Sequence, residues 1–479
     1  MIGPRSRLLP CVAFAALGAA CSGTEAAPGD PASAAPQSGG HATACPAPAH
    51  PFLAPSGTSN LHGDTYMSDT YAWAGPASPD LDVVQATLGG ECASLTFDAE
   101  GRILTVCIAI AGDRQLLMLD PTTLTVLARY DGLPTGSSAT TFGAGGYFYL
   151  DERSRVVVAT ADDRILRLAA NPGTGSFDVV ETLDLTTGPG ALVAADGTIE
   201  SALPDWAGRV WYVTEAGAVG FVDPASKQAR TLRLAGEAIG NSFAVDETGG
   251  VFVVTDHALY RLDVAASGEP AVTWREAYDR GSRLKPGQVN FGSGTTPTLF
   301  GDGWVAVTDN ADPRMNVLVY ARGKEHAGAR KLCEVPVFGD RLGGTENSLI
   351  GCNRSLVVEN NYGYASPASV LGTATTTPGF TRIDVRADAS GCDAVWTSSE
   401  SAPSVVSKLS VASDAVYSWT RTADGWFLTT IEFASGQTRW SARIGDGFGL
   451  DNYYAPISLG ADGAAYVGVI GGLVAMRSR

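Results

Sequence analysis

The sequence predicts an all-β protein built from one repeated four-stranded unit. Three observations support this prediction: the composition, a strand pattern that recurs along the chain, and the turns between the strands. Of 479 residues, 57 are Gly and 26 are Pro, while only 17% are charged. Many strands joined by tight turns give this profile, whereas a helical enzyme carries more Lys, Glu and Arg.

A strand–turn–strand pattern occurs eight times along the chain. The copies begin at residues 92, 146, 201, 242, 296, 348, 407 and 456. Third and fourth strands follow in segments such as GAVGFVDPASKQARTLRLA. A unit of four antiparallel strands in about 45 to 50 residues has the size of a propeller blade. The sequence therefore predicts a single eight-bladed β-propeller, with seven blades as the alternative count and two smaller propellers or a sandwich array as the alternative architecture.

The two ends of the repeat region predict how the ring closes. The last unit ends at GGLVAMRSR without a fourth strand, and LDVVQATLG, residues 81–89, precedes the first unit without a sheet of its own. An open stack of blades would leave an apolar sheet exposed at each end. We therefore expect the N-terminal strand to complete the last blade.

The N-terminus is typical of an export signal. Arg5 and Arg7 precede a short apolar run, residues 8–17, which is too short to span a bilayer. The following LGAAC resembles a bacterial lipobox, in which the cysteine is lipidated, and free secretion after ordinary cleavage is the alternative. The predicted organisation is a signal peptide at 1–21 with lipidation at Cys21, a disordered Ala/Pro/Gly tether at 22–56, and the propeller at 57–479.

The cysteine content predicts disulfides. Six cysteines lie outside the signal, and none of them forms a C-x-x-C pair. In an exported chain this favours disulfides over metal or redox motifs. Cys92 and Cys107 bracket two strands joined by a turn, so a bridge between them is expected, and Cys352 with Cys392 is the next candidate pair.

One turn sequence indicates a family. In ASGQTRW, residues 434–440, Ala434 and Gly436 form a turn and Trp440 follows on the next strand, while ASGCDAVW at 389–396 is a looser copy. This pattern resembles the repeat of the quinoprotein alcohol dehydrogenase-like eight-bladed propellers. Members of that family bind a quinone in the ring, commonly with Ca²⁺. This chain has no adjacent cysteines and no haem motif, which argues against quinone chemistry.

Polar residues precede the first strand of several blades. They are Glu91, Glu200, Asn241, Glu346, Asn347 and Asn452. Because first strands line the channel of a propeller, we expect these side chains to converge at one mouth. Carboxylate and amide oxygens are the ligands of hard cations, so Glu200, Asn241, Glu346 and Asn347 are the predicted Ca²⁺ ligands. The alternative is that they only solvate the channel.

The stretch around Asn241 also resembles strand starts of calcium-dependent lactonase propellers, in which a metal polarises an ester carbonyl. A second candidate site lies in NLHGDTYMSDTY, where His62, Asp64 and Asp69 either hold a metal or, as we favour, belong to a capped surface loop. No Gly-x-Ser-x-Gly elbow, P-loop or dinucleotide fingerprint is present in the sequence. The sequence assigns no catalytic residue.

The net charge of −17 argues against nucleic-acid binding. The leading hypothesis is a monomeric binding or scaffold module in the bacterial envelope, which contacts the membrane only through its lipid anchor and presents its faces to a protein or glycan partner. The alternative is a Ca²⁺-dependent enzyme, either a quinoprotein-like oxidoreductase or a lactonase-like hydrolase.

Overall fold

A computed structural model describes residues 40–43, 45, 47–109, 111–134, 143 and 145–479. The predicted signal peptide, Cys21 and residues 22–39 of the predicted tether lie outside these residues. The described helices are three short 3₁₀ turns: Ala194–Asp196, Pro367–Val370 and Phe448–Leu450. No helix in the described ranges is long and apolar enough to cross a membrane.

The strands form eight blades, which confirms the predicted propeller and its blade count. Blades 1 and 2 share a sheet through one parallel bridge between Arg129 and Ser176. The strands of blades 1 to 4 are β3 (Glu91–Phe97), β4 (Ile103–Ile108), β5 (Arg114–Leu119), β6 (Val126–Leu133); β7 (Phe148–Leu150), β8 (Val156–Ala159), β9 (Arg164–Asn171), β10 (Ser176–Asp184); β11 (Ile199–Pro204), β12 (Val210–Thr214), β13 (Ala218–Val222), β14 (Ala229–Arg233); and β15 (Ala244–Val245), β16 (Val251–Val254), β17 (Ala258–Val264), β18 (Pro270–Ala277).

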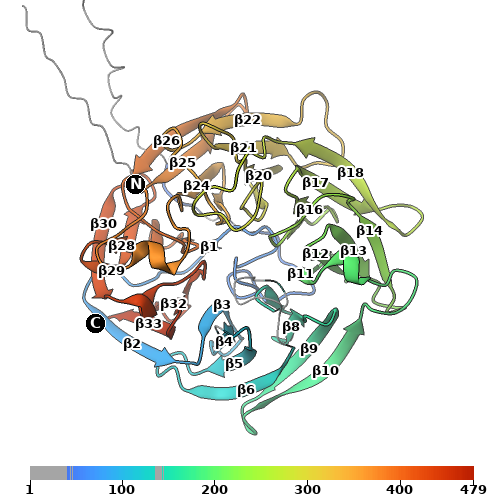
Figure 1. Ribbon diagram of the computed structural model, residues 1–479, viewed down its shortest axis with the longest axis horizontal. Coiled ribbons are helices and arrows are strands. Elements are labelled where there is room, and N and C mark those ends of the chain that lie inside the picture. Colours follow the sequence, from blue (N-terminus) through green and yellow to red (C-terminus); the bar gives the residue numbers. More distant parts are fainter. Residues whose placement is uncertain (1–39, 44, 46, 110, 135–142, 144) are drawn as a thin grey trace, which may run out of the picture. The chain divides into compact units, whose positions relative to one another are not determined.

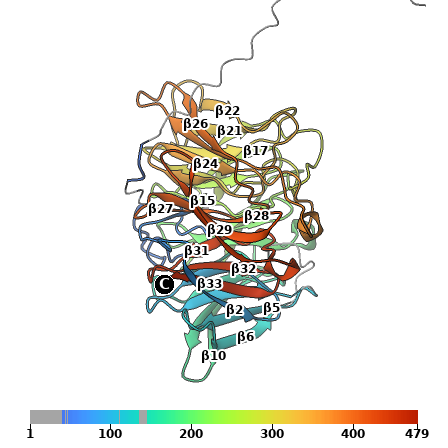
Figure 2. The ribbon, with the colours of Figure 1, turned by 90° about the vertical axis from the view of Figure 1, so that its left-hand side faces the viewer.

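The strands of blades 5 to 8 are β19 (Thr298–Phe300), β20 (Trp304–Thr308), β21 (Asn316–Ala321), β22 (Lys331–Pro336); β23 (Ile350–Cys352), β24 (Ser355–Glu359), β25 (Phe380–Val385), β26 (Cys392–Ser398); β27 (Lys408–Ser410), β28 (Ala415–Thr422), β29 (Gly425–Glu432), β30 (Thr438–Gly445); and β31 (Ile457–Leu459), β32 (Ala465–Val469), β33 (Gly472–Ser478), β2 (Leu81–Thr87). Figure 1 shows the blades following one another around the ring, with the fourth strands on the outside, and Figure 2 shows the ring from its side.

Closely related turns join the first two strands in blades 1 to 3. In blade 1 the Asp98 Oδ1 atom accepts the backbone N–H groups of Glu100 and Arg102, and its Oδ2 atom accepts a bond from the Arg102 side chain at 2.7 Å. The same arrangement recurs at Asp151 and at Asp205. Aspartate side chains favour such turns because they replace backbone acceptors, so the Asp-x-x-x-Arg spacing itself specifies each hairpin.

The ring closes as the sequence predicts. Strand β2 pairs antiparallel with β33, in a register from Leu81 opposite Ser478 to Thr87 opposite Gly472. The two strands lie side by side at the rim in Figure 1. The N-terminal strand thus supplies the outer strand that blade 8 lacks.

The chain before β2 packs against the ring, and this corrects the predicted end of the tether at residue 56. Leu53 and Ala54 are buried, the Ala54 N–H donates to the Leu150 carbonyl, and the His50 ring lies 4.0 Å from that of Trp206 in blade 3. Composition alone predicted disorder here because this stretch has few large apolar side chains. Its backbone hydrogen bonds and its disulfide to blade 6 provide the order instead.

We call residues 57–73 the plug because they run across the centre of the ring, where Figure 1 shows them in blue. Plug carbonyls accept N–H groups from the first strands of blades 2, 4, 5, 6 and 7; the pairs are Ser59–Leu150, Thr65–Val245, Tyr66–Leu299, Ser68–Gly351 and Asp69–Leu409, at 2.7 to 3.0 Å. The Thr58 carbonyl accepts a bond from Thr96 in blade 1, and the Trp73 indole donates to Leu459 in blade 8. A two-residue strand, β1 (Thr70–Tyr71), pairs parallel to β27.

Three disulfides join the described cysteines. The expected bridge between Cys92 and Cys107 links β3 to β4 and is confirmed. The expected pairing of Cys352 with Cys392 is wrong: Cys352 binds Cys45, which precedes the plug, and Cys392 binds Cys333 on the neighbouring blade. Cys352 lies on the first strand of blade 6 and Cys392 on its fourth, so the two face different neighbours.

The turn motif at 434–440 docks one blade on the next. The Trp396 indole of blade 6 is buried and donates to the Phe433 carbonyl of blade 7 at 2.9 Å. Gly436 has a φ of +73°, and a Cβ there would lie 2.5 Å from the Trp396 ring. Trp396, from the copy at 389–396, therefore packs over Gly436, from the copy at 434–440.

We expect Gly436→Ala to lower the free energy of unfolding by about 2–4 kcal/mol, because the left-handed backbone costs about 1 kcal/mol and the clash adds the rest. Gly463→Ala is the matched control, since Gly463 has a φ of +80° with nothing within 4 Å of its Cβ position. Urea unfolding of both variants measures the difference. Equal losses in the two would contradict the docking role of Gly436.

Candidate functional site

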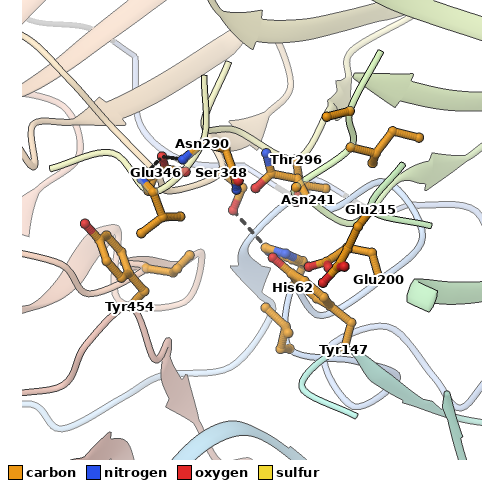
Figure 3. Close-up of a pocket in the computed structure, with 16 residues that line it drawn as sticks. His62, Tyr147, Glu200, Glu215, Asn241, Asn290, Thr296, Glu346, Ser348 and Tyr454 are labelled. Carbon is orange, nitrogen blue, oxygen red and sulfur yellow. Dashed lines mark hydrogen bonds between the residues drawn. The ribbon is translucent and has the colours of Figure 1, made fainter. Parts of the chain in front are cut away.

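A cavity of about 260 Å³ lies at the centre of the ring, and we call it the cup (Figure 3). Its polar and aromatic lining residues are His62, Tyr147, Glu200, Glu215, Asn241, Asn290, Thr296, Glu346, Ser348 and Tyr454. Its walls come from several blades, and Leu61 and His62 of the plug contribute its floor. The exposed residues Ala238 and Val289 also line it, so the cup reaches the surface. Its volume is slightly below the usual range of small-molecule sites.

The fold explains why the wall residues meet. Glu200, Asn241 and Glu346 each lie at or just before the start of the first strand of a different blade. Because each blade repeats the same topology, these positions fall at the same mouth of the ring. The sequence prediction that the three side chains converge is thus met in the cavity, with Glu200 and Glu346 on different sides of it in Figure 3.

The other predicted residues lie elsewhere. The Asn347 amide donates to Glu359 and to the Ser404 and Val405 carbonyls, so it faces the contact with blade 7 rather than the cup. Asn452 binds Ser404 and the Ala455 carbonyl, and Glu91 is not among the lining residues. Within the described ranges, no group of three or more His, Cys, Asp or Glu is placed to hold a metal ion. The Ca²⁺ site stays a prediction.

Burial controls the charge of the wall carboxyls. Burial, with the Glu215 charge as the next cause, raises the pKa of Glu200 to about 8, although the Arg114 guanidinium opposes this. Burial likewise raises the pKa of Glu346 to about 8, although its Oε1 accepts the N–H groups of Val289 and Asn290. At neutral pH both carboxyls are therefore largely protonated in the empty cup.

The floor residue His62 is held by an aspartate. Its Nδ1 lies 2.9 Å from Asp69 Oδ1, and the Ser348 hydroxyl also contacts both groups. Burial lowers the pKa of His62, so the ring is neutral at neutral pH. Because Asp69 is an acceptor, Nδ1 carries the proton and Nε2 keeps its lone pair. Nε2 is buried and has no hydrogen-bond partner among the described residues.

Asp69 stays ionised because a lysine lies against it. Burial alone would raise the pKa of Asp69, but Lys408 and His62 outweigh burial and the pKa lies below its usual range. The Lys408 ammonium is fully buried, donates to Asp69 and also bonds the Leu61 carbonyl at 2.7 Å. Lys408 was not identified as a site residue from the sequence, because it belongs to no recognisable motif.

The favoured interpretation of the His62 loop was a capped surface loop, and its local bonds agree with the capping. Asp64 Oδ1 accepts the N–H groups of Tyr66 and Ser68, and Oδ2 accepts the Ser68 hydroxyl. Asp64 is thus occupied within its own loop. The loop is buried at the ring centre, however, rather than at the surface.

Comparisons with known proteins leave the function open. No protein-family model matches the sequence. A relative from Archaeoglobus fulgidus, described as an uncharacterized protein, is 28% identical over 299 residues, and the match covers 56% of this chain and 58% of that protein. The chain thus spans a little over half the length of that relative.

Solved structures with a similar fold include BamB from Moraxella catarrhalis, at 12% identity and a TM-score of 0.49, covering 84% of this chain and 99% of that one. A streptogramin B lyase shares 8% identity with a TM-score of 0.45, covering 86% and 100%. The WD40 domain of Toxoplasma gondii coronin shares 14% with a TM-score of 0.42, covering 85% and 89%. At this level of similarity no ligand, activity or partner transfers to this chain.

The buried Asp69–Lys408 pair predicts a large asymmetry between charge variants. Lys408→Met leaves an unpaired carboxylate at the cup floor and should lower the free energy of unfolding by about 3–5 kcal/mol. Lys227→Met removes an exposed lysine paired with Glu181 and should cost less than about 1 kcal/mol. Urea unfolding checks both values. A Lys408 variant as stable as the Lys227 variant would show that the pair does not support the plug.

Proposed function

We propose that this β-propeller is an extracytoplasmic binding module whose cup accepts a small cationic group with N–H donors, namely a primary ammonium or a guanidinium. Three glutamates line the cup, whereas none of its described lining residues is Lys or Arg. This excess of acids around an enclosed space is the observation that carries the proposal.

The hydrogen-bonding groups of the cup support the same ligand. His62 Nε2 is an acceptor, and the Asn241 amide nitrogen already donates to the Ser293 carbonyl, which leaves its oxygen as an acceptor. The hydroxyl of Ser348 donates to Asp69. An ammonium has three donors and no acceptor, and a guanidinium has five. Acceptors from the floor and from separate walls therefore complement such a cation.

The cost of ionising the cup predicts how binding depends on pH. The cation favours ionised Glu200 and Glu346, so binding below their raised pKa values must release protons. For each carboxyl that ionises, affinity should rise about tenfold per pH unit between pH 6 and 8. The ligand itself remains protonated over that range because an alkylamine has a pKa near that of lysine, about 10.4.

Calorimetry with n-butylammonium tests the proposal. We expect binding that strengthens from pH 6 to 8, with an enthalpy that varies with the buffer because protons are released, and weaker binding of tetramethylammonium, which has no N–H donor. Glu200→Gln should weaken binding about tenfold or more. Glu359→Gln is the matched control: burial raises the pKa of Glu359 to about 8 as well, but this residue does not line the cup.

Two results would contradict the proposal. If n-butylammonium and alkylguanidinium both fail to bind, or bind the Glu200→Gln variant as tightly as the unchanged protein, the cup is not a site for these cations. If Ca²⁺ binds instead and releases protons, the predicted metal site at Glu200, Asn241 and Glu346 replaces it, and the enzyme alternatives gain support.

We further infer that the protein is exported to the bacterial envelope, anchored through Cys21, and related to the quinoprotein-like propellers. Three disulfides within the described residues favour an oxidising compartment. The basic and apolar N-terminal pattern supports the anchor at Cys21. The turns at 389–396 and 434–440 support the relation to the quinoprotein-like propellers.

Lipidation predicts that a metabolically supplied alkyne analogue of palmitate, coupled afterwards to a fluorescent azide, labels the protein and that Cys21→Ser abolishes the label. Cys11→Ser is the control, since Cys11 lies inside the predicted apolar run of the signal. The label is followed by gel fluorescence of the membrane fraction. Unlabelled protein in the culture medium would instead support free secretion.

A further inference from the structure

We infer that the cationic group that enters the cup is a lysine or arginine side chain of a protein partner, and that an apolar patch beside the cup binds the residues flanking it. This inference rests on the proposed function. The patch consists of Leu284, Val289, Phe291 and Leu342, whose exposed fractions are 42, 46, 50 and 47%.

The patch lies on two connections at the mouth of the cup. Leu284, Val289 and Phe291 lie between β18 and β19, and Leu342 lies between β22 and β23. Both connections lead into first strands, and the second one also carries Glu346. The connection that carries Asn241 leads into a first strand in the same way. Val289 itself lines the cup, so the patch reaches the cup at this residue.

Hydrogen bonds hold the two connections together. The Oε1 atom of Glu346 accepts the N–H groups of Val289 and Asn290, which ties the second connection to the first at the cup wall. Residues 361 and 363 of a third connection bond the carbonyls of Gly344 and Pro286 at 2.8 and 3.0 Å. The buried Lys285 ammonium bonds the Ala311 carbonyl. The apolar side chains are therefore presented by backbone that is fixed from several sides.

This arrangement has the form of a protein-binding hot spot. An enclosed acid-lined pocket that takes one basic side chain, with apolar contacts next to it, provides both an anchor and a surrounding seal against water. A free metabolite amine would use the cup alone and would leave the patch in water. Large apolar side chains gathered at a binding mouth indicate a partner larger than the cup.

Three capped tripeptides distinguish these cases. Acetyl-Leu-Lys-Leu-amide carries the charge and apolar flanks, acetyl-Ser-Lys-Ser-amide only the charge, and acetyl-Leu-norleucine-Leu-amide only the flanks. We expect the first to bind about tenfold more tightly than the second, since burying parts of two leucines contributes about 1–2 kcal/mol. The third should bind most weakly. An arginine version of the first peptide shows which cation is preferred.

Variants separate the patch from the cup. Phe291→Ser with Leu342→Ser should remove the advantage of the leucine flanks and leave n-butylammonium binding unchanged. Val180→Ser is the control, because Val180 is 49% exposed on β10, the outer strand of blade 2. Glu200→Gln should weaken the binding of both lysine peptides.

The outcomes are distinct. Equal affinity for the Leu and Ser flanks, with n-butylammonium still bound, overturns the docking inference and leaves the cation site intact. Binding of the norleucine peptide as tight as that of the leucine–lysine peptide also overturns it, because the cup then contributes nothing. Failure of every cation to bind overturns the proposed function, and the docking inference falls with it.

Discussion

The hydrogen bonds between the plug and the first strands determine both the ring and its central cavity. Six of the eight first strands are short: β15 has two residues, and β7, β19, β23, β27 and β31 have three each. Their inner edges face the channel and would leave backbone N–H groups unpaired there. The carbonyls of residues 59–71 pair with several of them. Because the same segment bonds to seven of the eight blades, the plug joins them at the centre while β2 joins the ends of the chain at the rim.

The plug also sets the chemistry of the cup. It places His62 at the floor and brings Asp69 against Lys408, which comes from blade 7. The carboxylate fixes the His62 tautomer, and the lysine keeps that carboxylate ionised, so a lone pair remains on Nε2. A buried ion pair adds little stability compared with apolar packing. Its presence here is better explained by the polar floor that it supports than by stability.

Local patterns predicted most of the fold. Alternating strands and the tight turns between them are short-range features, so the eight blades, the closing strand and the bridge between Cys92 and Cys107 could be inferred from them. The bridge between Cys45 and Cys352 spans 307 residues, and Cys45 lies in the segment before the plug, whose composition predicted disorder. Long-range pairing of that kind has no signature in the sequence.

The residues of the site could be predicted from the sequence only where the blade repeat determines the position of the side chain. Glu200, Asn241 and Glu346 share equivalent places in their blades, so the repeat predicted their convergence. Asn347 was wrongly grouped with them: it directly follows Glu346, and successive side chains of an extended chain point to opposite faces. His62 could be found as a polar residue in the sequence, but its place under the cup depends on how the plug crosses the ring.

The cation that we propose for the cup and the predicted Ca²⁺ require different arrangements of acceptors. Ca²⁺ requires six to eight oxygen ligands within about 2.6 Å of one point, whereas the acids here are spread around a cavity of about 260 Å³. Acceptors so separated suit a larger cation that reaches each through its own N–H group. Without a ligand, protonation of Glu200 and Glu346 avoids the cost of burying two like charges. Under the proposed function, the protons that stabilise the empty cup are the ones that an entering cation must displace, so the acidity of these two residues would determine both the stability of the empty cup and the binding.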